Sequence, residues 1–159
     1  YVNFVFVSAF IGYSIGTAPI IGYNYGSKND AEMKNIFKKS MGAITLFSLV
    51  LTAASLFLAA PISKIYVGYD GELFNLTVYA FRMFSTSYLI IGFNIFNNGA
   101  ISAAISFLRT LLFQILAILV LPAVFGKNAI WLSITVAEAA TLMITVAFLI
   151  ANRKKYHYA

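Results

Sequence analysis

Residues Gly16 to Ser40 read GTAPIIGYNYGSKNDAEMKNIFKKS, and this stretch decides how the rest of the chain is arranged. It joins two apolar segments of membrane length through a short connection. Asn29 is followed three residues later by Glu32, which is capping-box spacing with Asn in place of the commoner Ser or Thr, so a helix is expected to begin here. The cluster Lys34, Lys38 and Lys39 follows. A positive connection between two apolar spans is typical of a cytoplasmic loop.

The composition indicates an integral membrane protein. Of 159 residues, 61% are hydrophobic and only 10% are charged, whereas soluble domains are roughly 45–50% apolar and about 25% charged. The net charge is +6, but the basic residues lie at segment ends, so they are expected to orient the chain in the bilayer, and no nucleic-acid partner is expected. There is no cysteine, which excludes disulfides and thiolate metal sites.

Five apolar segments are predicted to cross the membrane, which makes the expected fold an all-α polytopic helical bundle. They cover about residues 1–22, 41–60, 74–98, 102–124 and 130–152, and roughly 20 apolar residues span the hydrocarbon core. Gly12 and Gly16 form a G-x-x-x-G pair that favours close helix packing in the first span. Pro61 is expected to end the second span.

The basic residues divide unevenly between the two sides of this predicted topology. Alternating five spans places eight of them on one side: Lys28, Lys34, Lys38, Lys39, Arg109, Arg153, Lys154 and Lys155. The other side holds two, Lys64 and Lys127. Because basic loops stay cytoplasmic, the C-terminus is predicted to be cytoplasmic.

Three motifs resemble one transporter family. The pattern G-x-A-P-I-I-G-Y-N-Y-G-x-K-N from Gly16 to Asn29 resembles the loop after the second helix of the C-terminal lobe in multidrug and toxic compound extrusion (MATE) transporters. The run from Asn98 to Thr110 is similar to a later part of that lobe, although the stretch before it is shorter than in the family. Ile130-Trp131, Ala137-Glu138 and the basic end Lys154-Lys155-Tyr156 give the third match. The motifs fall in family order and cover most of the chain.

The resemblance implies a function as well as a fold. The chain would be a partial C-terminal lobe, the last five of twelve helices, and its partners would be the lipid bilayer, small organic cations and an N-terminal lobe of the same polypeptide. The implied activity is plasma-membrane export of cationic drugs or xenobiotics in exchange for H⁺ or Na⁺, without another cofactor. A lipid-linked-oligosaccharide flippase of related architecture and a non-transporting scaffold or channel subunit are the alternatives. Enzyme and metal-site motifs are missing, and the single His157 lies in the basic tail, so no catalytic or metal residues are expected.

Glu138 is the only acidic residue inside a predicted span. A carboxylate at mid-bilayer is costly unless it is protonated or paired, so a coupling or cavity role, a structural ion pair and a tolerated lipid-facing position are all open. Counting residues from the outer ends of their spans places Arg82 at a similar depth, and we therefore predict that Arg82 pairs with Glu138 or shares a polar cavity with it. The alternative is that Arg82 extends to the outer interface.

Four further residues of the third span are candidates for a substrate path. Asn94 and Asn97 lie about one turn apart in its inner half, where amides either bond across helices or face the path. Tyr88 and Phe93 could supply aromatic surface for a flat cationic compound. Aromatic residues on such a helix also commonly face lipid.

Overall fold

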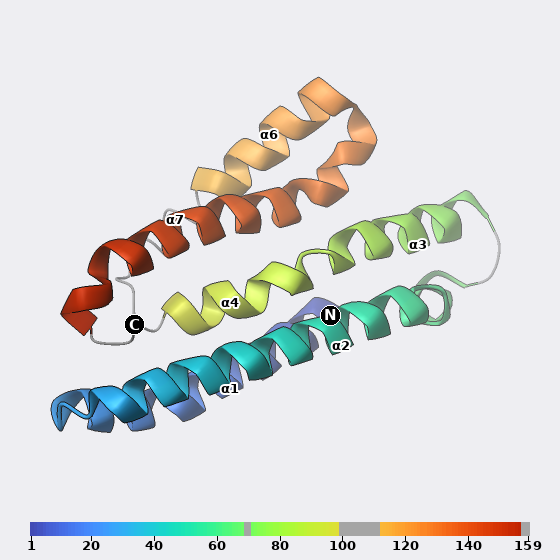
Figure 1. Ribbon diagram of the computed structural model, residues 1–159. Coiled ribbons are helices and arrows are strands. Elements are labelled where there is room, and N and C mark those ends of the chain that lie inside the picture. The colour runs from blue at the N-terminus through green and yellow to red at the C-terminus, as the bar shows by residue number, and fades with distance from the viewer. Residues whose placement is uncertain (69–70, 99–111, 157–159) are drawn as a thin grey trace.

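The computed structural model describes residues 1–68, 71–98 and 112–156, and within them the elements are helices joined by short turns (Figure 1). In chain order they are α1 (Val2–Gly26), α2 (Asp30–Val67), α3 (Glu72–Ser85), α4 (Tyr88–Asn98), α6 (Gln114–Phe125), the 3₁₀-helix η2 (Lys127–Leu132) and α7 (Ser133–Tyr156). The prediction of an all-α helical membrane bundle is confirmed.

The helices form three layers. α1 and α2 make an antiparallel hairpin, α3 and α4 follow one another through the middle, and α6 and α7 form a second hairpin on the far side (Figure 1). α4 contacts α1 and α2 on one side and α7 on the other. Its contacts with the first hairpin centre on a buried apolar cluster of Phe10, Ile44, Ile91 and Phe96.

Three helical stretches are long and apolar enough to cross a membrane: Val2–Gly26, Asp30–Val67 and Lys127–Ala151. α3 and α4 together give a fourth candidate, bent by 43° at the break between them. α6 is apolar but only 12 residues long. The predicted span 102–124 begins outside the described residues, which resume at residue 112.

The predicted cap of α2 forms, although only in part. The side-chain carbonyl of Asn29 accepts a hydrogen bond of 3.2 Å from the backbone N–H of Glu32. The Glu32 carboxylate does not return to the cap, because both of its oxygens accept from the Asn35 amide at 3.1–3.2 Å, and the backbone N–H of Asn29 donates to the carbonyl of Asn24 at 2.9 Å. Asn29 therefore begins the helix as a single-sided cap.

The second helix extends further than the sequence predicted. It continues through Pro61 and ends at Val67, so the predicted end at Pro61 is wrong. A proline removes one backbone donor, and membrane helices tolerate this loss when surrounding groups compensate. At 38 residues the helix is about 57 Å long, which exceeds the hydrocarbon thickness of about 30 Å. Its lysine-bearing first turns therefore have room to extend beyond the apolar zone.

Close approach of helices occurs at Gly92, not at the predicted glycine pair. Gly12 and Gly16 are exposed, and a Cβ added at either would have open space around it, so the predicted packing there is wrong for the described helices. A Cβ at Gly92 would overlap the ring of Phe10, with Cδ1 at 2.7 Å and Cζ at 3.0 Å. Gly92 therefore lets α4 lie directly against α1.

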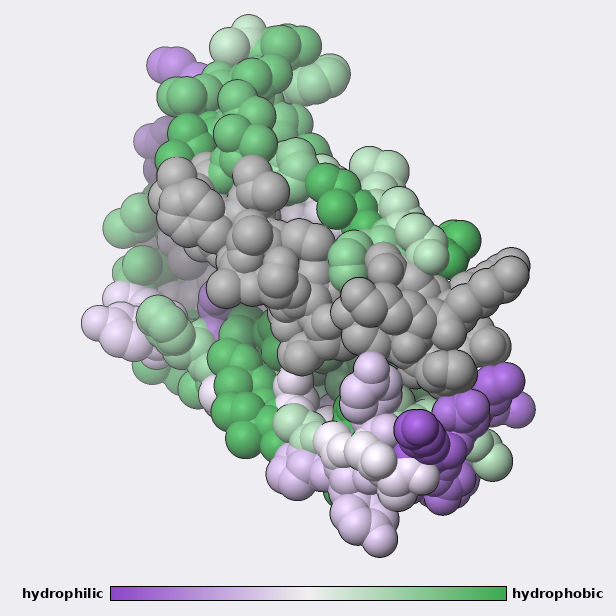
Figure 2. Space-filling view, turned by 90° about the vertical axis from the view of Figure 1, so that its left-hand side faces the viewer, coloured by the Kyte–Doolittle hydropathy of each residue, from purple (hydrophilic) through white to green (hydrophobic). Residues whose placement is uncertain are grey.

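The polar connections gather at the ends of the bundle. The α1–α2 connection and the C-terminal end of α7 lie at the same end, on the left of Figure 1. Lys34, Lys38 and Lys39 are exposed at this end, and Figure 2, which looks at it, shows hydrophilic residues gathered below the apolar helices. Lys64 and Lys127 lie near the opposite end, where α2 and α6 finish. The lysines of the first connection and the pair Lys64 and Lys127 therefore lie at opposite ends of the bundle, as the predicted alternation of spans requires.

Candidate functional site

Three consecutive hydroxyl residues interrupt the third span. Ser85 donates to the carbonyl of Phe81 at 2.7 Å, Thr86 to that of Met83 at 2.7 Å and Ser87 to that of Phe84 at 2.8 Å. Hydroxyls that bond to carbonyls of the preceding turn compete with the backbone ladder and bend helices. The run Ser-Thr-Ser thus gives a local physical reason for the 43° bend between α3 and α4.

The break is also tied to the last helix. The hydroxyls of Thr86 and Thr135 are 2.9 Å apart. Since the single hydroxyl proton of Thr86 goes to the Met83 carbonyl, Thr135 is the donor in this pair. A hydrogen bond therefore joins the break between α3 and α4 to the first turn of α7.

The central polar feature joins α4 to α7 beyond the break. The side-chain amide of Asn94 donates to the Glu138 carboxylate at 2.6 Å and to the Glu138 backbone carbonyl at 2.9 Å. Asn94 is fully buried, with no exposed surface, and Glu138 is partly buried. The only acidic residue predicted inside a span therefore lies within the bundle and accepts two hydrogen bonds from the Asn94 amide, one at its carboxylate and one at its backbone carbonyl.

The oxygen of the Asn94 side chain has no partner among the described residues, although it is buried. Both N–H groups of the amide are used by Glu138, so this oxygen is free to accept from a proton donor or to face a cation. One turn after Glu138 on α7, the hydroxyl of Thr141 donates to the Ala137 carbonyl at 2.9 Å. Thr145 is fully buried, and its hydroxyl has no partner in the described part of the chain. Glu138, Thr141 and Thr145 thus lie on one polar face of α7, and Asn94 of α4 contacts this face.

The predicted partnership of Arg82 with Glu138 is not present. Arg82 is exposed in the last turn of α3, whereas the carboxylate of Glu138 is bonded to Asn94. Arg82 lies twelve residues before Asn94, which is roughly 18 Å along a helix. Counting residues from the outer ends assumed that both spans start at the same level. The contact of Thr86 with Thr135 shows that they do not, because Thr86 lies twelve residues after Phe74 and Thr135 only five after Ile130.

The other predicted residues lie in two different places. Asn97 is 5% exposed and Phe93 packs against the apolar core cluster, so both help to hold α4 in the bundle. Tyr88, at the start of α4, is buried, with its ring against Phe6 at 5.3 Å and Phe84 at 5.9 Å. Its ring lines a cavity in a different region of the bundle, away from Asn94 and Glu138.

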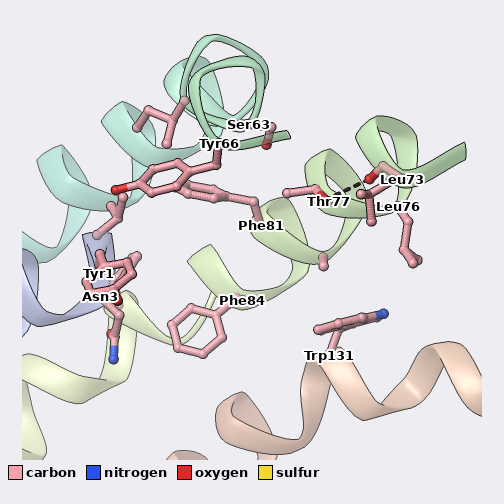
Figure 3. A pocket seen from close by; sticks show the side chains of 14 residues that line it. Tyr1, Asn3, Ser63, Tyr66, Leu73, Leu76, Thr77, Phe81, Phe84 and Trp131 are labelled. Carbon is pink, nitrogen blue, oxygen red and sulfur yellow. Dashed lines mark hydrogen bonds between the residues drawn. The ribbon is translucent and has the colours of Figure 1, made fainter. Parts of the chain in front are cut away.

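That cavity has a volume of about 440 Å³ and lies between α1, α2, α3, the start of α4 and η2 (Figure 3). Six of the side chains lining it are aromatic: Tyr1, Tyr66, Phe81, Phe84, Tyr88 and Trp131. Of these six residues, only Tyr88 was predicted from the sequence as a site residue. Phe81, Phe84 and Tyr88 recur at intervals of three and four residues, which is the spacing of one helical face and the signal that could have revealed them.

A stripe of small polar residues on α2 was also missed. Ser40, Ser48, Thr52, Ser55 and Ser63 are all buried, at helical spacing and on the helix that contacts α3 and α4. Small residues of this kind let membrane helices approach closely. The same spacing in the sequence would have identified this face.

These features define a polytopic helical membrane protein with a broken span and a bonded carboxylate inside the bundle. The described residues contain no group of three or more His, Cys, Asp or Glu side chains that could hold a metal ion. The chain matches the MatE family model over residues 1–127 and belongs to that family. Members of the family are transporters and not enzymes, so the chain is of the MATE transporter type. No curated protein and no solved structure matches it.

Proposed function

We propose that the protein is a secondary antiporter that exports organic cations in exchange for H⁺ or Na⁺, and that Glu138 is its coupling residue. The observation that carries the proposal is the hydrogen bond from Asn94 to Glu138, 2.6 Å long, between two membrane helices. A carboxylate at this depth is expensive to retain, and such residues in transporters commonly relay protons or bind ions. The bonded geometry supports a coupling role more than contact with lipid.

The broken span supports the same proposal. Transporters commonly place ion and substrate sites beside discontinuous helices near the membrane midplane. Here α4 begins just after the break, and its Asn94 holds Glu138. A proton or Na⁺ at the carboxylate would compete with the Asn94 amide for the carboxylate oxygen that it bonds, so ion binding would loosen α4 from α7. Because α4 is a separate helix beyond a bend, it could shift without moving α3.

Alternating access then needs a second body. We infer that these helices rock against an N-terminal lobe of the same transporter around a central substrate path, with the protein in the plasma membrane and its C-terminus in the cytoplasm. The orientation rests on the excess of basic residues at one end of the bundle.

The experiment follows two fluorescent organic cations, ethidium and N-methylacridinium, in sealed vesicles that contain the full-length protein under an imposed pH or Na⁺ gradient. We expect gradient-driven movement in the wild type and its loss in Glu138→Gln. Glu72→Gln is the matched control, because Glu72 is exposed in the first turn of α3, and its movement should equal the wild type.

Movement in Glu138→Gln equal to the wild type would remove the coupling role. If neither cation moves in folded wild-type protein, the antiport proposal itself fails, and the flippase and scaffold alternatives gain support.

A further inference from the structure

One face of α2 stays exposed along the helix while its character changes from basic to apolar. Lys34, Lys38 and Lys39 are exposed in the first turns. From Lys38 onward, at intervals of three and four residues, the exposed face continues through Gly42, Leu46, Leu49, Ala53 and Phe57. A face of this kind matches a molecule that carries an anionic head and apolar chains.

The buried side of the same turns holds this face outward. Met33, Ser40 and Ile44 are buried, and the hydroxyl of Tyr13 on α1 donates to that of Ser40 at 3.0 Å. Ile44 belongs to the apolar cluster that joins α2 to α1 and α4. Because these contacts fix the rotation of α2, its lysines lie on the outer surface of the bundle.

The levels of the two parts match one leaflet of a bilayer. Residues 40–63 carry no charge and extend for about 36 Å along the helix, enough to cross a hydrocarbon core of about 30 Å. The hydrocarbon therefore begins just after Lys39, and the lysines lie at the level of the headgroups. Half of the core is about 15 Å, or roughly ten residues, so the acyl chains of this leaflet reach from Gly42 past Leu46 and Leu49.

The lysines of α2 belong to the basic end of the bundle. Residues 28–39 hold four lysines against Asp30 and Glu32, which gives a net charge of +2. Both acids precede the lysines of α2, and the Glu32 carboxylate accepts hydrogen bonds from the Asn35 amide. The end of α7, whose sequence includes Arg153-Lys154-Lys155, lies at the same end of the bundle, where Figure 2 shows hydrophilic residues.

Gly42 leaves a notch between the basic and the apolar part of the face. It is exposed, and a Cβ built on it would meet no atom within 4 Å. Glycine within a helix is destabilising relative to alanine, and none of the described helices uses the space at this position. The glycerol of a phospholipid could therefore approach the backbone of α2 next to the lysines.

We propose that this face of α2 binds one anionic phospholipid. The phosphate lies among the three lysines, the glycerol lies at Gly42, and the chains follow Leu46 and Leu49. Each basic residue close to a membrane surface strengthens the attraction of anionic lipids by about fivefold. An acidic protein segment would use the lysines but not the apolar residues that continue the same face. The site goes beyond the proposed export, because it needs neither substrate nor gradient.

The test measures lipid occupancy next to Gly42. This sequence has no cysteine, so Thr45→Cys, at an exposed position, takes a single bimane label; any cysteine elsewhere in the full-length protein is replaced by serine. The labelled protein, in phosphatidylcholine nanodiscs, receives small fractions of phosphatidylglycerol or phosphatidylcholine that carries a doxyl quencher near the top of one chain. We expect half-maximal quenching at about a tenfold lower fraction of phosphatidylglycerol than of phosphatidylcholine.

Two matched pairs of variants locate the site. Lys38→Gln should raise the half-quenching fraction of phosphatidylglycerol about threefold, and Lys39→Gln serves if Lys38→Gln does not fold. Lys127→Gln removes the same charge from an exposed position at the start of η2 and should leave that fraction unchanged. Gly42→Leu fills the notch and should raise the fraction at least about twofold. Ala53→Leu adds a side chain to the same exposed face near mid-bilayer and should have no effect.

Three results would overturn the proposal. The first is equal half-quenching fractions of the two lipids in the wild type. The second is an equal effect of Lys38→Gln and Lys127→Gln, because the preference would then follow the overall charge of the protein. The third is a Gly42→Leu variant that behaves as Ala53→Leu does, because the lysines would then attract anionic lipid only diffusely and no lipid would be seated on α2.

Discussion

The contact of Gly92 with Phe10 predicts how firmly α4 is fixed to α1. Gly92→Ala places a methyl group against a ring that is only 3% exposed and is held from another direction by Phe47, with ring centroids 6.0 Å apart. Replacing Gly by Ala within a helix stabilises it by up to about 1 kcal/mol, whereas overpacking a core costs about 1–3 kcal/mol. Because the ring cannot swing away freely, we expect a net loss of about 1–2 kcal/mol in the free energy of unfolding.

The assay is unfolding of the purified protein in mixed micelles of increasing SDS fraction, followed by circular dichroism. Gly12→Ala is the matched control, because a Cβ there meets open space, and it should be neutral or stabilising. Phe10→Leu combined with Gly92→Ala should recover part of the loss, with a coupling energy of about 1 kcal/mol. Equal stability of Gly92→Ala and Gly12→Ala would refute the reasoning.

Three further changes test individual contacts. Asn29→Ala removes the cap of α2 and should cost about 1 kcal/mol, seen as faster hydrogen exchange at the first amides of that helix; unchanged exchange would argue against the cap. Thr86→Val should also cost about 1 kcal/mol in SDS unfolding, and adding Thr135→Val should cost little more, so two fully additive losses would contradict the pairing. Asn94→Ala removes the hydrogen bond that Asn94 donates to the Glu138 carboxylate and should cost about 1.5–3 kcal/mol. This loss should shrink in a Glu138→Gln background, and the same loss in both backgrounds would contradict the bond.

Hydropathy predicted the extents of the first and last described helices well, because it is a property of long stretches. α1 and α7 lie close to the predicted spans 1–22 and 130–152. The break at Thr86 was missed because it depends on three hydroxyls bonding to their own preceding turn, and the same residues facing a neighbouring helix would have left the span straight. Pro61 was given too much weight as a helix end, since a proline limits a helix less inside a bundle than in water.

The candidate site was predictable in part. Glu138 stood out as the lone acidic residue of a span, and Asn94 was named as a candidate for bonding across helices. Their partnership could not be derived, because residue counting fixes depth along a helix but gives neither the bend nor the rotation that decides which faces meet. The Gly12–Gly16 pair packs against none of the described helices for the same reason, since its spacing is correct but its face is turned outward.

The coupling of ion movement to cation movement by Glu138 is the central proposal for this protein. The direct measurement is the balance point of exchange in vesicles, the opposing gradient of N-methylacridinium at which net movement stops while the pH or Na⁺ gradient is varied at zero membrane potential. A tenfold ion gradient is worth about 1.4 kcal/mol, so one-for-one exchange would hold about a tenfold cation gradient. We expect the wild-type balance point to follow the gradient of the coupling ion in this way and that of Glu138→Gln to stay at equal concentrations. A Glu138→Gln balance point that follows the ion gradient as the wild type does would contradict the account.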